Sequence, residues 1–521
     1  MNYITIVKSM RKLLCVLLCF GSAAGETFPQ KVMTRFEADT VLPPGLKWST
    51  EATVKASDGA MWERSVNGLY RRDSVGPERD RIQYFAGKRY LADDDVTALA
   101  PDSNGGVWVR TRTGISHIEY RPMTLEEKAA AFEQRIRERH DRYGLVASSM
   151  LREPGNLASN QLEPTDNDGL WTAIYAAAEC FRYAVTKSSQ ALANAVKSLD
   201  AMLFLEQVTG RPGFPARSYI RKGDWRPKDG TWHWTADGQY EWKADTSSDE
   251  IVGHFFAFGI AYDLLPDAGL KKRIQVTTRR IMDHIIEHGY NLIDVNGKPT
   301  TWGKWSREYF ESRTGKPDSA LNALELLSFL KTAEHITGDE KYGHEYRKVA
   351  FDLKYLDQTT RYLELRQEIN YSDEELAMLP FYLVFRYERD EKMLDRYRDA
   401  LGQWWRNIER EKNPLWTFIY AASKPAAAPD YDAAVWILRR IPMDLVEWTV
   451  VNSKRSDVKL DGGRDRFRQP QSTTLLPPDE RPIMKWNSNP FRIDGGNGGR
   501  GEDDGAFFLL PYWMGRYQGN L

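Results

Sequence analysis

The strongest constraint in this sequence is an alternation between two kinds of helical segment, which runs from residue 124 to the C-terminus. One kind carries apolar and small residues on all sides, and such segments begin near Asp168, Ser247, Asp318, Ser372, Leu415 and Asp503. The other kind has one charged face and spans 124–143, 188–208, 268–288, 339–356, 392–410 and 430–448. A helix that is apolar all round has to be buried, and an amphipathic helix can cover it. The pattern predicts a mainly α domain with an inner and an outer ring of six helices each.

The connections between these helices are unequal in length. Each inner segment joins the next outer one through a tight turn, for example at 186–187 and 337–338, whereas several outer-to-inner connections are long and span 210–246, 289–317 and 451–502. Helices that alternate in direction place all connections of one kind at the same end. Long loops in a compact domain are usually functional. We therefore expect the functional site at the end where the inner helices begin.

This arrangement resembles the (α/α)6 toroid of many glycoside hydrolases and polysaccharide lyases, over residues 124–517. The first inner segment, TDNDGLWTAIYAAAECFRYAVT, and the last, DDGAFFLLPYWMGRY, look like inner helices of such toroids. The resemblance rests on this architecture and on a Trp-rich rim, without a motif that identifies one enzyme family. It implies a carbohydrate-active enzyme with an oligo- or polysaccharide substrate, in a catalytic domain at 123–521.

Residues 26–122 have the short alternating strands and the Asn-Gly and Thr-Gly turns of a β-rich unit. The stretch GAMWERSVNGLY at 59–70 recurs as GVWVRTRTGI at 106–115. Both copies resemble the blade repeat of two-component-regulator propellers. Because a closed propeller needs more than two blades, we expect this β appendage to pack on the helical domain instead of closing on itself.

The first 25 residues have the pattern of a secretory signal peptide. Lys8, Arg11 and Lys12 precede a short apolar run at 13–20, and small residues follow at 21–25. This run is too short to span a membrane, and no other segment is long and apolar enough to do so. The sequence therefore predicts export to the periplasm or the medium. Cys180 would be the one cysteine left, as a buried small hydrophobe.

Charge and aromatic content narrow the class of ligand. The formal net charge is −1, from 72 basic and 73 acidic residues, so there is no basic footprint for nucleic acid. Aromatic residues make up 12% of the chain and include 17 Trp, whose faces pack well on sugar rings. The candidate substrate-binding aromatics are Trp225, Trp232, Trp234, Tyr240, Trp242, Trp302, Trp305 and Tyr371. Core packing is the alternative role for all of them.

Cations interleave with these aromatic residues. Arg221, Arg307 and Arg500 could bind the carboxylates of an acidic sugar, because a guanidinium grips a carboxylate with two hydrogen bonds. Arg500 lies in the glycine-rich run at 496–501, which matches G-x-G-x-x-G but lacks the preceding strand of a dinucleotide site. The alternative for Arg221 and Arg307 is that they belong to a charged surface in contact with solvent.

Carboxylates stand at the starts of the inner segments, where Asp168, Asp249, Glu250 and Asp503 could serve as catalytic acids or as helix caps. Glu250 also fits a capping box with Ser247. His254 follows Glu250 by one helical turn, so both would share a face, which we expect to line the lumen as an acid–base pair. A buried, hydrogen-bonded histidine is the equal alternative.

The first hypothesis for function is a polysaccharide lyase acting on a uronate-containing glycan, with His233, His254, Tyr309 or Tyr371 abstracting the proton. A glycoside hydrolase that uses two of the carboxylates is the second hypothesis, and a non-catalytic glycan-binding or sensor-derived protein is the third. The run HIIEH at 284–288 matches a metallopeptidase pattern, but no third ligand is identifiable. We therefore expect no metal cofactor, with assistance by Ca²⁺ left open, as are the glycan, the linkage and the oligomeric state.

Overall fold

The computed structural model describes residues 23–36, 42–366, 369–465, 467–482, 484–485 and 487–521. Most of the predicted signal peptide lies outside these residues. Within them, no helix is long and apolar enough to cross a membrane.

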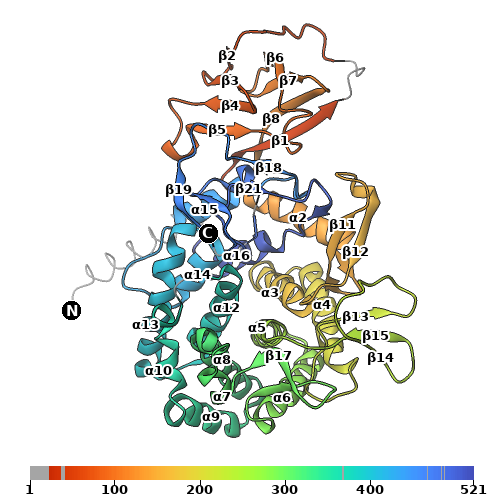
Figure 1. Ribbon diagram of the computed structural model, residues 1–521, viewed down its shortest axis with the longest axis vertical. Coiled ribbons are helices and arrows are strands. Elements are labelled where there is room, and N and C mark those ends of the chain that lie inside the picture. The colour runs from red at the N-terminus through yellow and green to blue at the C-terminus, as the bar shows by residue number, and fades with distance from the viewer. Residues whose placement is uncertain (1–22, 37–41, 367–368, 466, 483, 486) are drawn as a thin grey trace, which may run out of the picture.

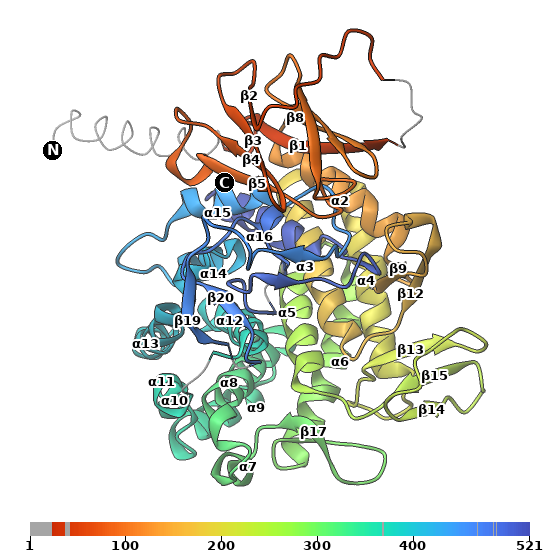
Figure 2. The ribbon, with the colours of Figure 1, turned by 45° about the horizontal axis from the view of Figure 1, so that its top comes forward.

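The helical part is an (α/α)6 toroid, as the alternation predicts (Figures 1 and 2). Its inner helices, in the described part of the chain, are α3 (Asp168–Thr186), α5 (Ser248–Leu264), α8 (Ser319–Thr337), α12 (Tyr371–Tyr387), α14 (Pro414–Ala422) and α16 (Ala506–Gln518). The outer helices are α2 (Leu125–Arg139), α4 (Ser189–Gln207), α6 (Ala268–Glu287), α9 (Glu340–Arg347), α13 (Glu391–Ile408) and α15 (Tyr431–Arg440). Each inner helix packs on the next, and α16 packs on α3, so the inner ring closes.

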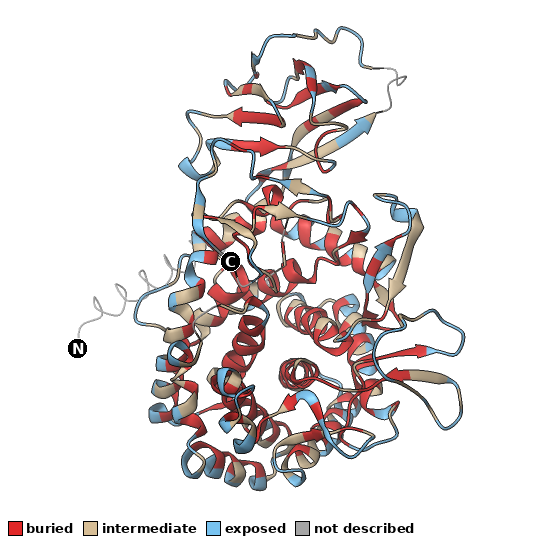
Figure 3. Ribbon diagram, viewed as in Figure 1, coloured by how far each residue is buried: buried red, intermediate tan, exposed pale blue. Residues whose placement is uncertain are grey.

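Burial separates the two rings as their sequences predict. The inner helices form one continuous hydrophobic core, in which α5 is buried from Glu250 to Ala261 (Figure 3). The helices α3 and α5 approach each other closely at two glycines. A Cβ atom on Gly253 would lie 2.7 Å from the Cα atom of Leu170, and one on Gly169 would meet the carboxylate of Glu250. Cys180 is a free cysteine inside this core.

The long connections all leave the outer helices and enter the inner ones. They carry β9 (Asp141–Arg142), β10 (Leu145–Val146), β11 (Ser148–Leu151), β12 (Asn160–Glu163), β13 (Ser218–Arg221), β14 (Trp232–Trp234), β15 (Tyr240–Lys243), β16 (Asn291–Ile293), β17 (Pro299–Lys304), α7 (Arg307–Glu311), α10 (Tyr355–Thr359) and α11 (Tyr362–Leu365). The last one carries β18 (Val450–Val451), β19 (Leu460–Arg464), β20 (Pro470–Ser472), β21 (Asp494–Gly495) and β22 (Gly501–Glu502).

Hydrogen bonds join these loops into one layer over the mouth of the ring. Strand β22 pairs with β11, although nearly the whole toroid separates them in sequence. The amide of Thr301 donates to the Asp245 carboxylate at 2.7 Å, and the amide of Asp168 donates to the carbonyl of Arg217 at 3.1 Å. The long loops therefore share one end, where the inner helices begin.

The outer helices α9 and α15 both end before the predicted limits of their segments, and the early end of α15 bears on the site. We expected an amphipathic helix over 430–448, but α15 ends at Arg440. Ile441 comes next and precedes Pro442, and the residue before a proline is disfavoured in the helical conformation. The chain from Leu445 to Trp448 is extended instead, and this matters for the site described below.

In the described residues, the appendage consists of two four-stranded antiparallel sheets. One sheet has the order β2 (Thr53–Lys55), β3 (Met61–Ser65), β4 (Gly68–Arg72), β5 (Ile82–Phe85), and the other has the order β1 (Phe28–Phe36), β8 (Ile115–Met123), β7 (Val107–Thr111), β6 (Val96–Pro101). The N-terminal strand β1 thus completes the second sheet. Trp62, Phe85 and Val109 belong to one core between the sheets. The relation of these sheets to propeller blades stays a prediction.

The appendage packs on the toroid through a buried ionic network. Arg440, at the end of α15, contacts Asp479 at 2.9 Å, Glu480 at 3.0 Å and Asp80 of the appendage at 2.6 Å. Lys31 of β1 also reaches Asp479, at 2.6 Å. Buried ion pairs offset the loss of hydration only when their geometry is good. The appendage therefore has to keep the position that holds Asp80 and Lys31 against their partners on the toroid.

Candidate active site

A cavity of about 530 Å³ opens at the mouth of the ring, between α3 and the start of α16. Strand β11, Trp171 of α3 and the final long loop line it. From that loop, the titratable side chains that line the cavity are Glu447, Lys485, Glu502, Asp503 and Asp504. Its volume falls within the usual range of small-molecule sites, about 300–1,000 Å³.

Two antiparallel segments hold the carboxylates of this cavity in place. The amide of Asp503 donates to the carbonyl of Leu445 at 3.0 Å, and the amide of Glu447 donates to the carbonyl of Gly501 at 2.9 Å. The Glu447 carbonyl accepts two further bonds from the backbone amides of Asn497 and Gly499. The Asn497 side chain donates to the carboxylate of Glu447. Glu447 and Asp503 therefore stand on adjacent, rigidly paired stretches of backbone.

Burial and the neighbouring charge of Asp503 leave Glu447 partly protonated near neutral pH. Burial, together with the negative charge of Asp503, raises the pKa of Glu447 to about 7. Burial also raises the pKa of Asp503, but the ammonium of Lys485 lies 3.5 Å from its Oδ1 atom and opposes that shift. Glu447 can therefore carry a proton near neutral pH while Lys485 favours the anionic form of Asp503, which is the combination that an acid and a base require.

The three consecutive acids at 502–504 have different roles. Glu502 turns toward α2, where its carboxylate pairs with Arg139 at 2.7 Å, and these contacts lower its pKa to about 2. Asp504 accepts a 2.6 Å hydrogen bond from the amide of Ala506, the first residue of α16, and it also binds Lys485 at 3.1 Å. Among the described residues, Asp503 contacts Lys485 but no arginine and accepts no hydrogen bond from the start of α16, which leaves it as the acid of the run that can act on a ligand in the cavity.

Trp171 supplies an aromatic wall. It is half-buried in the first turn of α3, and the Lys485 ammonium lies 4.8 Å from its ring centroid. An indole face beside paired carboxylates is suited to a sugar ring, whose C–H groups pack on it. Our sequence analysis named Asp503 but missed Glu447, Lys485 and Trp171.

The expectation that Glu250 and His254 face the lumen is wrong. His254 is fully buried between helices, with Nδ1 2.6 Å from the carbonyl of Glu250 and Nε2 3.2 Å from the carbonyl of Met202 in α4. The Glu250 carboxylate is also buried and accepts a 3.0 Å hydrogen bond from the amide of Gly169. Ser247 makes no capping bond, because its hydroxyl donates to Asn167. Both side chains thus tie α3, α4 and α5 together.

Asp168 also has a structural environment. It is fully buried, accepts hydrogen bonds from Arg142 and from the Ser218 hydroxyl, and lies outside the cavity of Glu447. These contacts attach α3 to strands β9 and β13.

A second group of predicted residues meets around Glu325 of α8. Burial raises the pKa of Glu325 well above its ordinary value, and the charges of Asp249 and Asp373 add to this effect. The Trp305 indole donates to Glu325 at 2.7 Å, so this tryptophan is a buried partner and not part of a rim. Tyr309 donates to Asp318 at 3.1 Å close by. Carboxylates from α5, α8 and α12 therefore influence one another across the ring.

The remaining aromatic candidates lie in the same layer of loops but not around Glu447. Trp225, Trp234 and Trp302 are about half exposed, whereas Trp242 is buried. The side chains that pack against neighbours are Trp232 with Arg226, His233 with Trp242, Tyr240 with Phe204, and Arg221 with Tyr143. Tyr371 is buried at the start of α12, Arg307 pairs with Glu311, and Arg500 is exposed beside β22. None of these lines the cavity.

No group of three or more His, Cys, Asp or Glu side chains in the described ranges is arranged to hold a metal ion. In the HIIEH run, His284 Nε2 accepts a 3.0 Å hydrogen bond from the amide of Ile293, and His288 binds the carbonyl of His284. Both histidines thus stabilise the end of α6.

No protein-family model and no curated protein matches this chain. Among solved structures, the chain is similar to a sugar epimerase from a ruminal bacterium, with 11% identity, a TM-score of 0.37, and coverage of 75% of this chain and 99% of that one. It is also similar to a family 76 glycoside hydrolase from a bovine Bacteroides thetaiotaomicron strain (8% identity, TM-score 0.40, coverage 94% and 98%) and to a metagenome-derived family 9 endoglucanase (13% identity, TM-score 0.33, coverage 95% and 96%). At this level of likeness, the three structures carry no inference about activity.

Proposed function

We propose that the chain is a glycoside hydrolase whose catalytic pair is Glu447 and Asp503. The observation that carries this proposal is the pKa of Glu447, raised to about 7 beside a second carboxylate in an open cavity. Most glycoside hydrolases need two carboxyl groups at the bond that is cleaved, one protonated as the acid and one ionised.

In the proposed reaction, protonated Glu447 donates its proton to the glycosidic oxygen as the bond from that oxygen to the anomeric carbon breaks. Asp503, an anion beside Lys485, stabilises the positive charge that develops on the sugar. It then either bonds to the anomeric carbon or removes a proton from the attacking water. Water supplies the hydroxyl of the new reducing end, and its other proton restores the acid. Trp171 supports the sugar ring.

The cavity suits hydrolysis better than the eliminative cleavage that the sequence favoured. A lyase must neutralise the uronate carboxylate and remove the C5 proton. Among the described residues that line the cavity, Lys485 is the lysine or arginine side chain, and Asp503 and Asp504 already balance its charge. His140 is fully buried, with its Nε2 atom 3.5 Å from Glu502. The cavity thus offers a carboxylate pair but, within the described chain, no free cation beside a free base.

The test combines a substrate screen with one variant. The full chain would be assayed on neutral and acidic polysaccharides for new reducing ends and for the ultraviolet absorbance of unsaturated uronates. We expect new ends without that absorbance, and a loss of roughly 10²–10⁴ in turnover for Glu447→Gln, the usual contribution of a positioned acid. Glu163→Gln is the matched control, because burial also raises the pKa of Glu163, which lies in β12 outside the cavity.

Leaving-group and pH dependence separate an acid from a residue that only shapes the site. An aryl glycoside with an acidic leaving group should largely escape the effect of Glu447→Gln, since it needs no proton. In the native protein, kcat/KM should fall as the pH rises through about 7, because Glu447 then loses its proton. Absorbance together with new ends would establish a lyase, and neither signal on any glycan would leave a binding protein. The sequence of residues 1–25 adds the proposal that the substrate lies outside the cytoplasm.

A further inference from the structure

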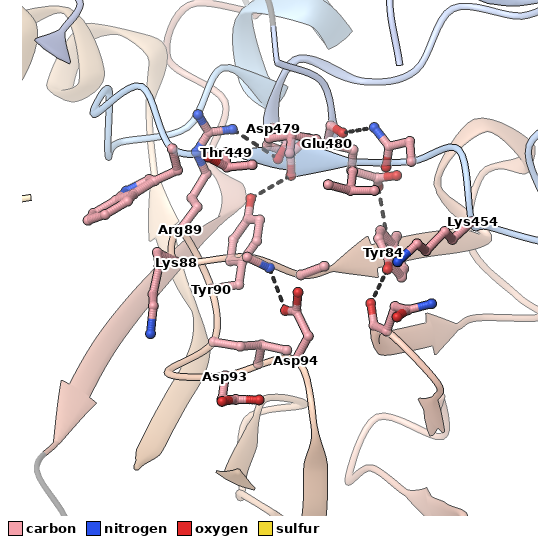
Figure 4. A pocket seen from close by; sticks show the side chains of 18 of the residues that line it. Tyr84, Lys88, Arg89, Tyr90, Asp93, Asp94, Thr449, Lys454, Asp479 and Glu480 are labelled. Carbon is pink, nitrogen blue, oxygen red and sulfur yellow. Dashed lines mark hydrogen bonds between the residues drawn. The ribbon is translucent and has the colours of Figure 1, made fainter. Parts of the chain in front are cut away.

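A groove of about 460 Å³ lies between the appendage and the toroid, separate from the cavity of Glu447 (Figure 4). The turn after β5, residues 86–91, and the acids Asp93 and Asp94 form the appendage side. Residues 448–452, Lys454 and the pair Asp479 and Glu480 form the toroid side. Both units of the protein therefore contribute to this site.

The groove is preformed, because hydrogen bonds connect its two sides. The amide of Tyr84 donates to Glu480 at 3.1 Å, and the hydroxyl of Tyr90 donates to Asp479 at 3.1 Å. At its floor the two backbones touch, since a Cβ atom on Gly87 would lie 2.8 Å from the carbonyl oxygen of Thr449. A ligand would bind here without having to organise the site first.

Several polar groups of the groove have unused bonding capacity. Lys454 is exposed and makes no hydrogen bond or ion pair within the described residues. One carboxylate oxygen of Asp94 accepts a 2.7 Å bond from the amide of Gly87, while the other accepts none among the described residues. Arg89 is only 3% exposed, and its Nε atom has no partner in the described chain. Lys454 and Asp94 can therefore each bind a ligand without giving up an existing contact.

The mixture of charges restricts the class of ligand. Lys88 and Lys454 lie at opposite ends of the groove in Figure 4, with Asp93 and Asp94 along the appendage side. The two carboxylates would repel a phosphate or a nucleic acid, and an apolar ligand would leave every one of these charges desolvated. A sugar hydroxyl both donates and accepts, so an oligosaccharide satisfies donors and acceptors together.

We propose that this groove is a second oligosaccharide-binding site. It shares a wall with the cavity of Glu447. Glu447 lines the cavity, while the next residues, Trp448 and Thr449, line the groove. In the segment paired with them, Asn497 lines the cavity and Gly498 lines the groove. If the chain has the proposed hydrolase activity, on which this role rests, the groove adds binding energy only for substrates long enough to contact both sites.

The decisive experiment is a calorimetric titration of the full chain carrying Glu447→Gln, which removes turnover. The probes are mannotetraose, cellotetraose, xylotetraose and tetragalacturonate. We expect at least one of them to bind at two sites. Adding Lys454→Ala and Asp94→Asn should weaken one site about tenfold, the effect of losing two hydrogen bonds. The amide oxygen introduced by Asp94→Asn can still accept the bond from Gly87, so the turn should keep its shape. Lys459→Ala is the control, an exposed lysine of the same loop outside the groove.

Kinetics would separate the groove from the proposed activity. In a background with intact Glu447, the double substitution should raise KM for a polymer and leave kcat on a short substrate unchanged. If no glycan is cleaved but the titration still shows a site that the double substitution weakens, the hydrolase proposal fails and the groove stands. Two results together would overturn the proposal that the groove binds oligosaccharides. The double substitution would leave the titration curves unchanged, and Trp171→Ala would abolish all binding.

Discussion

The appendage depends on Arg440, and replacing this residue tests how much the buried network contributes to stability. Its guanidinium lies within 3.0 Å of three carboxylates, those of Asp80, Asp479 and Glu480. Methionine has a similar reach without the charge. In Arg440→Met, Asp479 would keep Lys31, Glu480 would keep Arg455, and Asp80 would keep the indole of Trp436.

Breaking a buried ion pair from one side costs about 3–5 kcal/mol. Because each remaining carboxylate keeps one partner, we expect the lower end of that range, about 3 kcal/mol, for Arg440→Met. The neighbouring Arg439→Met is the matched control. Arg439 pairs at 2.8 Å with Glu26, whose side chain is 62% exposed, and such pairs contribute about 0–1 kcal/mol.

Urea unfolding followed by tryptophan fluorescence would measure both variants, with limited proteolysis to report release of the appendage. Burial alone would raise the pKa of Asp479, but the charges of Arg440 and Lys31 outweigh it and hold the pKa well below its ordinary value. The stabilisation that Arg440 provides through Asp479 is therefore fully present above about pH 4, the pKa of an aspartate in the unfolded chain. It is lost as the pH falls toward the lower pKa that Asp479 has in the folded protein. Equal stability of the two variants at neutral pH, or a difference that survives strong acid unchanged, would refute this account.

Two further substitutions, one with a control variant, and one deletion test the packing of the fold. Gly253→Ala should lower the free energy of unfolding by about 1–3 kcal/mol, because its Cβ would meet the Leu170 backbone. As a control, Gly402→Ala has no atom within 4 Å of the new Cβ and should stabilise α13 by about 0.5–1 kcal/mol. Similar melting temperatures for the two variants would contradict the close approach of α3 and α5. His254→Ala should lower the melting temperature but preserve turnover per folded molecule, and a folded but inactive variant would return this histidine to the active site. Deleting the residues before Met123 should lower the solubility and stability of the protein, because the deletion uncovers α15 and removes the Lys31 partner of Asp479. A truncated protein that is equally stable and soluble would show that the appendage is independent of the toroid.

The ring of helices could be predicted because it follows from local patterns. In α5, apolar residues surround the helix and demand burial on every side, whereas in α13 they form one stripe. Turn lengths then decide which ends lie together. These signals are all contained within one helix and its neighbouring turn, so they survive without knowledge of the rest of the structure.

The same pattern misled us about Glu250 and His254. A helix that is apolar around its whole circumference gives no direction for a polar side chain, since every face is buried against something. The choice between the lumen and a neighbouring helix depends on which of those surfaces offers a hydrogen-bond acceptor. Met202, far away in sequence, supplies its carbonyl, and no property of α5 reveals that.

Glu447 escaped notice for a related reason, although one signal pointed to it. The amphipathic pattern over 430–448 hid it in an outer helix, where a glutamate is an ordinary surface residue. Pro442 should have ended that helix and freed the following residues to form an extended segment. Even then, the partner of that segment is the backbone around Gly501, beyond a long irregular loop. That pairing brings Glu447 to Asp503, and the charge of Asp503 helps to raise its pKa into the range of a catalytic acid. A carboxylate of this chain becomes an acid, a cap or an ion-pair partner through contacts that its own neighbours in sequence do not specify.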